Sequence, residues 1–316
     1  MEKPVIYTLT LNPAIDRELT IAAFEFNAVL RAMHARVDWG GKGFNVSRLL
    51  MGLGAPSTAT GFVGGKAGEF LQAGLQALGI RTDFVWVQDE TRTNVSIVTP
   101  TGGQYIKVNE AGPAIAPEKQ QELLAKIEAL ASPGDWWVLA GSLPPGVPPS
   151  FYAQIINILN AQGALSLLDT TGEALRLGCG AKPFLIKPNA EETQALTGLP
   201  MTTPAEIAQA ASHLRGLGAR HVVISLGKAG ALLQTAENEN WLAHSPSIQE
   251  KNPIGAGDSM VGGLVWALTQ GLALPDALTW GMASGAATAS LSGTAVGARP
   301  LIEELQAQVR LEKLQL

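Results

Sequence analysis

The clearest chemical motif in the sequence is a turn of small residues that ends in one carboxylate. Gly255-Ala256-Gly257-Asp258 follows Pro253 and leads into an apolar helix that we expect to end near Gln270. Helix N-termini leave backbone N–H groups unpaired and carry partial positive charge, and glycines let a phosphate approach them closely. Asp258, in the first turn, can accept a proton from a hydroxyl. A capped helix after an ordinary turn also explains these residues, so the motif alone leaves two interpretations open.

A second glycine-rich turn, Gly40-Gly41-Lys42-Gly43, leads into a helix that we expect over residues 45–53. Lys42 supplies positive charge there, and Asn45 supplies hydrogen bonds. The sequence has no G-x-x-x-x-G-K-[ST] loop, no G-x-G-x-x-G after a strand and no His-Arg-Asp. The missing dinucleotide fingerprint counts against a dehydrogenase. The four histidines are scattered without the spacing of metal ligands.

Two further turns follow buried strands in the second half of the chain. Lys187-Pro188-Asn189 precedes Glu192. In the functional interpretation, Asn189 and Glu192 lie beside a hydrated Mg²⁺, an ion that usually keeps several of its waters. An Asn followed three residues later by a Glu is also typical of a capping box that starts a helix. Ser225-Leu226-Gly227, together with Gly230, has the composition of a loop that faces a nucleotide.

These turns must be positioned by the elements before and after them. Short apolar runs separated by helical patterns predict strands at 136–140, 165–169, 184–186 and 222–224, with helices from about Ser150 and from Asn189. This alternation indicates an α/β fold, a mainly parallel sheet between helices, in which ligands bind at the carboxyl ends of the strands. Residues 83–87, 94–99 and 104–108, with a turn at 101–103, read as antiparallel hairpins. We therefore expect one domain over 1–316, with a small β-sheet inserted from about 13–38 and 82–109.

The composition excludes several classes of protein. Of the 316 residues 46% are apolar and 16% charged, which is too apolar for a mainly disordered chain. One cysteine, Cys179, excludes a disulfide framework and a cysteine-clustered metal site. The net charge of −5 counts against a general nucleic-acid binder. Residues 277–298 carry no charge, but their glycines, serines and threonines favour a buried helix over a membrane span. With no secretory pattern at its start, the chain is expected to be a cytoplasmic enzyme.

Taken in order, six motifs resemble the ribokinase-like sugar kinases. The resemblance is strongest to their phosphofructokinase-B branch, which contains 1-phosphofructokinases, minor 6-phosphofructokinases and tagatose-6-phosphate kinases. It spans about residues 5–300 and implies a kinase that uses ATP and Mg²⁺. The motifs are Asn12-Pro13-x-x-Asp16, Gly40-Gly41-Lys42-Gly43-x-Asn45, Gly141-Ser142-Leu143-Pro144, Lys187-Pro188-Asn189-x-x-Glu192, Ser225-Leu226-Gly227 and Gly255-Ala256-Gly257-Asp258.

The resemblance also assigns roles to residues. Asp258 would be the general base, and the backbone of Gly255, Ala256 and Gly257 would stabilise the transferring phosphoryl group, in line with chemistry that depends on positioning and electrostatics. Glu192 would organise Mg²⁺ through water. The small β-sheet would be a lid that also pairs between subunits, giving a homodimer. The expected sugar-binding residues are Asp16, Gly40, Gly41, Lys42, Asn45, Arg92 and Ser142, and the expected ATP-binding residues are Lys187, Asn189, Ser225, Gly227 and Gly230.

The substrate is the least determined part of the prediction. Lys42 and Arg92 fit a sugar phosphate better than a free sugar, unless Arg92 only pairs with Asp89 or Glu90 at the surface. The segments 12–16, 91–95 and 257–261 look most like 1-phosphofructokinases, which favours conversion of fructose 1-phosphate to fructose 1,6-bisphosphate. Segments 64–70 and 252–253 look like tagatose-6-phosphate kinases, and 103–105 looks like the 6-phosphofructokinase type. A regulator that binds nucleotide or sugar without catalysis is the alternative of a different class. Neither nucleic acid nor membrane is an expected partner.

Overall fold

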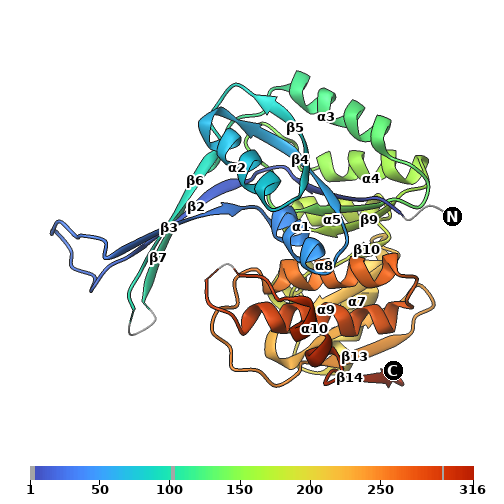
Figure 1. The fold of residues 1–316 in the computed structure, drawn as a ribbon. Coiled ribbons are helices and arrows are strands. Elements are labelled where there is room, and N and C mark those ends of the chain that lie inside the picture. Colours follow the sequence, from blue (N-terminus) through green and yellow to red (C-terminus); the bar gives the residue numbers. More distant parts are fainter. Residues whose placement is uncertain (1–3, 101–103, 294) are drawn as a thin grey trace.

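The main body of the protein is built on one large sheet. The computed structural model describes residues 4–100, 104–293 and 295–316 (Figure 1). Seven of its strands, β11, β10, β9, β8, β1, β4 and β5, pair in parallel with one another. The other three, β12, β13 and β14, pair antiparallel at one side of the sheet. The spatial order of the ten strands is β14 (Arg310–Leu314), β13 (Asn240–His244), β12 (Ala231–Gln234), β11 (His221–Ser225), β10 (Leu185–Ile186), β9 (Leu165–Asp169), β8 (Trp136–Ala140), β1 (Ile6–Thr10), β4 (Ser57–Gly64) and β5 (Arg81–Val87).

Helices cover both faces of this sheet, as Figure 1 shows. Strand β8 is buried throughout, because Trp137 and Leu139 point into one helical layer while Val138 and Ala140 point into the other. This double burial explains why the central strands read as continuous apolar runs. The first layer contains α3 (Pro117–Leu130), α4 (Phe151–Ala161), α5 (Gly172–Gly180), α6 (Ala190–Thr197) and α7 (Pro204–Gly216). The second contains α1 (Lys42–Gly52), α8 (Ala256–Thr269), α9 (Leu274–Ala289) and α10 (Arg299–Gln306). The helix α2 (Gly65–Ala77) packs on β4 and β5, and a short 3₁₀ turn, η1, spans Gly227–Ala229.

The predicted α/β class and the four predicted parallel strands are confirmed, but two helix predictions need correction. Helix α1 begins at Lys42 rather than Asn45. The uncharged stretch 277–298 is not one helix, because α9 ends at Ala289 and the chain turns through Gly293, which has a φ of +69°. None of the helices in the described ranges is long and apolar enough to cross a membrane.

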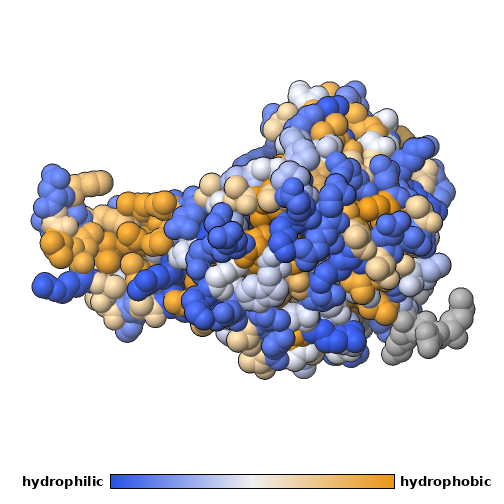
Figure 2. All heavy atoms as spheres, turned by 90° about the horizontal axis from the view of Figure 1, so that it is seen from above, coloured by the Kyte–Doolittle hydropathy of each residue, from blue (hydrophilic) through white to orange (hydrophobic). Residues whose placement is uncertain are grey.

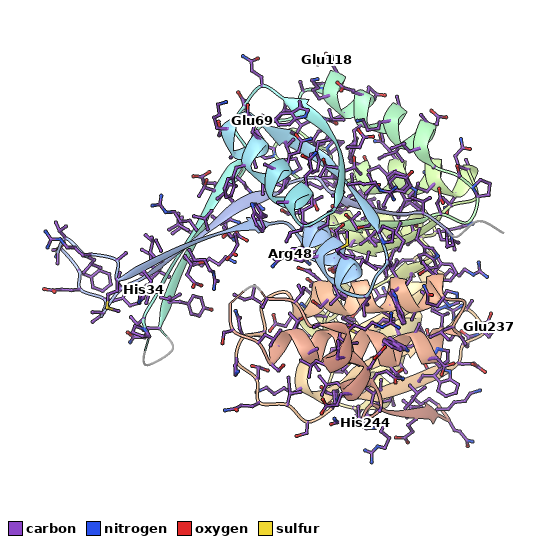
Figure 3. The ribbon with its side chains drawn as sticks, in the orientation of Figure 1. His34, Arg48, Glu69, Glu118, Glu237 and His244 are labelled. Atoms are coloured by element: carbon purple, nitrogen blue, oxygen red, sulfur yellow. The ribbon has the colours of Figure 1, made fainter. Side chains whose placement is uncertain are left out.

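Four strands form a separate small sheet that projects from the body (Figure 1). Their order is β3 (His34–Gly40), β2 (Ala14–Thr20), β6 (Arg92–Val98) and β7 (Tyr105–Asn109). His34, labelled in Figure 3, lies far out on this projection. The predicted boundary of 82–109 is wrong at its start, because β5 pairs in parallel with β4 in the main sheet. Because β5 is an edge strand, part of it is exposed to solvent. Its polar first residues therefore have the sequence pattern of a strand in an exposed antiparallel hairpin. The predicted turn at 101–103 lies outside the described residues.

The small sheet has two chemically different faces. Strand alternation and register place Asp16, Asn94, Lys107 and Asn109 on one face. The opposite face is apolar, and Figure 2 shows apolar atoms gathered on the projecting part of the molecule. Its large exposed apolar side chains are Val37, Ile106 and Val108, and the segment between β2 and β3 adds Phe26, Val29, Leu30 and Met33.

The one cysteine is part of the core. Cys179 lies in α5 and is fully buried against the first helical layer. Burial raises the pKa of its thiol to about 12. Cys179 is therefore a packing residue and has no reactive thiolate near neutral pH.

Candidate active site

A pocket of about 1010 Å³ lies where the carboxyl ends of the parallel strands meet the polar face of the small sheet. It brings together residues that are far apart in the sequence, as expected for this class of sheet. The residues after β8, β9, β10 and β11 contribute, and so does the N-terminus of α8. All but one of the predicted site residues line it: Asp16, Gly41, Lys42, Asn45, Arg92, Ser142, Lys187, Asn189, Glu192, Ser225, Gly227, Gly230, Gly255, Ala256, Gly257 and Asp258.

Gly40 is the exception, and its role is different from the predicted one. A Cβ atom at Gly40 would stand 2.3 Å from Asp16 Oδ2 and 2.9 Å from the carbonyl oxygen of Ala14. Gly40 therefore leaves room for the Asp16 carboxylate beside β3. It supports a pocket residue and does not line the pocket.

Asp258 is the third residue of α8 and is almost fully buried. The N-cap of this helix is Gly255 with a φ of +79°, and no side chain caps it, so the interpretation of Asp258 as a helix cap is wrong. Asp258 Oδ2 accepts a hydrogen bond of 2.8 Å from Asn45 Nδ2. Burial and then the charge of Asp169 raise the Asp258 pKa to about 6, against the opposing effects of Asn45, Lys42 and Lys187. The carboxyl is thus a stronger base than an exposed aspartate and still mostly ionised at neutral pH.

Two lysines converge on one buried carboxylate beside Asp258. Lys42 Nζ lies 3.3 Å from Asp169 Oδ2, and Lys187 Nζ lies 3.4 Å from Asp169 Oδ1. Desolvation alone would lower the pKa of Lys42, but Asp169, Asp258 and Glu192 outweigh it and raise that pKa. Lys187 also reaches the glycine turn, because its Nζ is 3.8 Å from the position of a Cβ on Gly257. The site therefore combines two ammonium groups with a helix N-terminus, which suits a transferring phosphoryl group.

Asp169 was not predicted as a site residue. Its only sequence signal was its place as the last residue of a predicted strand. The side chain is 2% exposed at the carboxyl end of β9, and its partners lie 127 and 18 positions away along the chain. These two ion pairs depend on how the strands are arranged in the sheet, so they could not be inferred from the sequence.

The turn at Asn189 and Glu192 shows that both of its predicted interpretations are compatible. Asn189 Oδ1 accepts from the Glu192 N–H at 2.7 Å, and Glu192 Oε2 accepts from the Asn189 N–H at 2.9 Å, which is a complete capping box. Both residues nevertheless line the pocket. A β-bridge between Asn189 and Ser225 brings this turn beside the Ser225–Gly230 loop. The two predicted nucleotide-side segments are therefore neighbours.

Unsatisfied polar atoms are concentrated in the pocket. In the described part of the chain, ten buried side-chain polar atoms have no hydrogen-bond partner, and five of them belong to residues that line the pocket. Buried polar groups are normally paired, so this concentration indicates positions that a bound ligand would satisfy. One of these residues, Asn94, was not predicted as a site residue. The sequence signal for it was the alternation of β6, which places Asn94 on the same face as Arg92. The five atoms are Thr10 Oγ1, Asn12 Oδ1, Arg92 Nε, Asn94 Oδ1 and Asp169 Oδ1.

Arg92 lies on β6 of the small sheet and bonds to the backbone of two segments at the pocket. Its Nη1 donates to the Glu110 carbonyl at 2.8 Å, and its Nη2 donates to the Asn12 carbonyl at 2.9 Å. Burial lowers the Arg92 pKa, and the carboxylates of Asp16 and Glu110 oppose that effect. The alternative of a surface pair with Asp89 or Glu90 is wrong, since these backbone contacts hold the guanidinium at the pocket.

Comparison with known proteins defines the class of this site. Residues 1–300 match the pfkB family of carbohydrate kinases. A 1-phosphofructokinase from Bacillus subtilis is 36% identical over 310 residues, which cover 98% of this chain and 100% of the relative. The structure of phosphofructokinase-2 from Escherichia coli in complex with potassium superposes with a TM-score of 0.91 at 31% identity, covering 96% of this chain and 98% of the other. Ribokinase from Arabidopsis thaliana has the same fold, with a TM-score of 0.79 at 21% identity over 96% of this chain and 99% of the other.

The chain belongs to the pfkB family of carbohydrate kinases and has a ribokinase-like fold. Its pocket contains the N-terminus of α8, Lys42, Lys187 and the buried carboxylates of Asp169 and Asp258. This protein is an ATP-dependent phosphotransferase that acts on a carbohydrate.

Proposed function

We propose that this kinase phosphorylates a fructose phosphate, with fructose 1-phosphate as substrate and fructose 1,6-bisphosphate as product. The observation that carries the proposal is that two sets of residues line the same pocket. Asp258 and the glycine turn form one set, and Asp16, Asn94 and Arg92 of the small sheet form the other. A sugar phosphate placed between them has its free hydroxyl at the base and its existing phosphate at the sheet. Full-length similarity to 1-phosphofructokinases supports this substrate class.

In the proposed reaction Asp258 accepts the proton of the C6 hydroxyl of fructose 1-phosphate. The sugar oxygen forms a bond to the γ-phosphorus of ATP while the bond from that phosphorus to the β,γ-bridging oxygen breaks, and ADP leaves. The N–H groups of the Gly255–Asp258 turn and the ammonium of Lys187 stabilise the negative charge on the phosphoryl oxygens. Asn45 donates to Asp258 Oδ2 and orients the carboxylate. The small sheet acts as a lid that excludes water from the transfer.

The residues on the nucleotide side fit a hydrated magnesium ion. In the described ranges no three His, Cys, Asp or Glu side chains form a metal cage. The capping box uses Oε2 of Glu192, and Asp169 Oδ1 is a buried oxygen that has Lys187 Nζ at 3.4 Å as an ion-pair partner but accepts no hydrogen bond. Mg²⁺ usually retains several waters, so these two carboxylates suit contacts made through water. The bound ion would neutralise charge on the ATP phosphates.

A coupled ADP-release assay at saturating MgATP tests the function, with fructose 1-phosphate, fructose 6-phosphate and tagatose 6-phosphate compared on the same protein. We expect the highest kcat/KM for fructose 1-phosphate. A preference for tagatose 6-phosphate or fructose 6-phosphate would replace the substrate and leave the kinase mechanism in place. If the protein released no ADP with any of the three hexose phosphates, the result would favour the non-catalytic regulator.

We expect Arg92→Ala to raise KM for the hexose phosphate by about 10–100-fold while KM for ATP changes little, since a charge-assisted hydrogen bond contributes roughly 1.5–3 kcal/mol. The substitution also removes the bonds to the Asn12 and Glu110 carbonyls, so both Michaelis constants are measured together with the melting temperature. Arg176→Ala is the matched control, because Arg176 pairs with Glu173 on the surface of α5. An unchanged hexose-phosphate KM in Arg92→Ala would remove Arg92 from the substrate site.

The apolar face of the small sheet is the surface through which we propose a homodimer. Val108 and Ile106 are exposed there, and the segment between β2 and β3 adds the exposed side chains of Phe26 and Val29. Exposed apolar patches of this kind mark interaction sites. Light scattering should give the mass of a dimer for the wild type and of a monomer for Val108→Asp. Leu272→Asp, at an exposed apolar residue of the body, should remain dimeric, and a monomeric wild type would contradict the proposal.

A further inference from the structure

One lysine of the pocket has a different electrostatic setting from the others. Lys107 lies on β7 and lines the pocket. Register pairs Asn94 with Asn109 and Ser96 with Lys107, so Lys107 lies two register positions farther from the body than the row of Asp16, Asn94 and Asn109. Because alternate residues of a strand share a face, Lys107 is on the same face as these three side chains. Ile106 and Val108 point to the apolar face instead.

The remaining cations of the pocket already have carboxylate neighbours. Lys42 and Lys187 share Asp169, and Lys228 pairs with Glu250 at 3.6 Å. The charge of Arg92 is offset by Asp16 and Glu110, and two of its N–H groups are engaged by backbone carbonyls. Within the ranges that the structure describes, no carboxylate lies within ion-pairing distance of Lys107. Lys107 is therefore the pocket cation whose charge is left for a ligand.

We infer that Lys107 binds the phosphate already present on the sugar and is a specificity-determining residue for phosphorylated substrates. The inference rests on the proposed function, since it requires a hexose phosphate between Asp258 and the small sheet. The reacting hydroxyl and the existing phosphate are at opposite ends of fructose 1-phosphate, so the phosphate belongs away from Asp258, at the part of the pocket that the small sheet lines. Lys107 lies on an exposed strand, and its ammonium can give a phosphate dianion a charge-assisted hydrogen bond. Arg92 would then contribute its remaining N–H groups to the hexose phosphate, while Lys107 supplies a charge that no carboxylate of the protein offsets.

Lys107→Met tests this inference because methionine keeps an unbranched side chain without the charge. We expect KM for the hexose phosphate to rise about 10–100-fold, the effect of losing one charge-assisted hydrogen bond. The value of kcat and KM for ATP should change less than threefold, and Lys107→Arg should recover most of the lost affinity. Lys66→Met is the matched control, since Lys66 pairs with Glu69 on α2, away from the pocket. Glu69 lies on the surface of the body in Figure 3.

The assay uses whichever hexose phosphate the wild type turns over best, so that a wrong substrate does not conceal the result. A hexose-phosphate KM within threefold of the wild type in Lys107→Met would overturn the inference and leave the proposed function intact. Equal losses in Lys107→Met and Lys107→Arg would also overturn it, because the effect would then come from the shape of the lid and not from charge. A wild type that is inactive on fructose 1-phosphate contradicts only the proposed substrate.

Discussion

Asp258→Asn is expected to lower kcat by about 10²–10⁴-fold, the usual contribution of a general base. Asparagine has nearly the same shape as aspartate, and its amide oxygen can still accept the hydrogen bond from Asn45 Nδ2. It cannot accept the proton of the sugar hydroxyl. The fold and ATP binding should therefore persist, which the melting temperature and an ATP titration would show.

The adjacent helix provides a matched control for this substitution. Asp276 is the third residue of α9, the same helical position that Asp258 occupies in α8, but it is exposed. Asp276→Asn removes the same charge from a helix N-terminus and should leave kcat unchanged. If Asp258→Asn retains more than about a tenth of the wild-type kcat with chemistry rate-limiting, Asp258 is not the base.

The pH profile gives a second readout for the same residue. Asp258 must be ionised to accept a proton, and burial with the nearby Asp169 raises its pKa to about 6. The value of kcat/KM should therefore fall as the pH drops below about 6 and be level above it. This acid limb should be missing from the residual activity of Asp258→Asn.

Lys187→Met should lower kcat by about 10²–10³-fold, the cost of removing one preorganised donor to a developing negative charge. Lys187 is 4% exposed, and its ammonium lies against the glycine turn. Methionine fills a similar volume, and Asp169 keeps its contact with Lys42, so the protein should remain folded. Steady-state kinetics with fructose 1-phosphate would measure the loss.

Lys182→Met is the control for this second prediction, because Lys182 is exposed after α5 and does not line the pocket. It should leave kcat unchanged. A loss of less than tenfold in Lys187→Met would mean that the ammonium only balances the charge of Asp169. In that case stability, and not turnover, would be the property that changes.

The central sheet could be predicted from the sequence because its strands are buried on both faces. Trp136–Ala140 is apolar at every position, and its end at Gly141 is marked by a turn. Strand β5 could not be assigned in this way, since its edge position leaves Arg81 exposed and hides its parallel partner. Local composition identifies a strand, but the pairing of an edge strand depends on the rest of the sheet.

The same distinction applies to the site. Asp258 could be identified because the glycine turn and the helix after it are local in the sequence. Asp169 could not, because its significance comes from Lys42 and Lys187, which reach it from other strand ends. Lys107 and Asn94 were missed for a related reason, since register across β6 and β7 places them on the polar face.

The burial of Cys179 makes the chain suitable for spectroscopic labelling. Its thiol is the only one in the sequence, and a fully buried group with a pKa near 12 is not accessible to thiol-directed dyes in the folded protein. A pair of cysteines introduced at exposed positions, such as Tyr105 on the small sheet and Leu272 on the body, would carry the fluorophores without any change to the native background. Energy transfer between them would then report in real time whether the small sheet moves relative to the body when substrate is added.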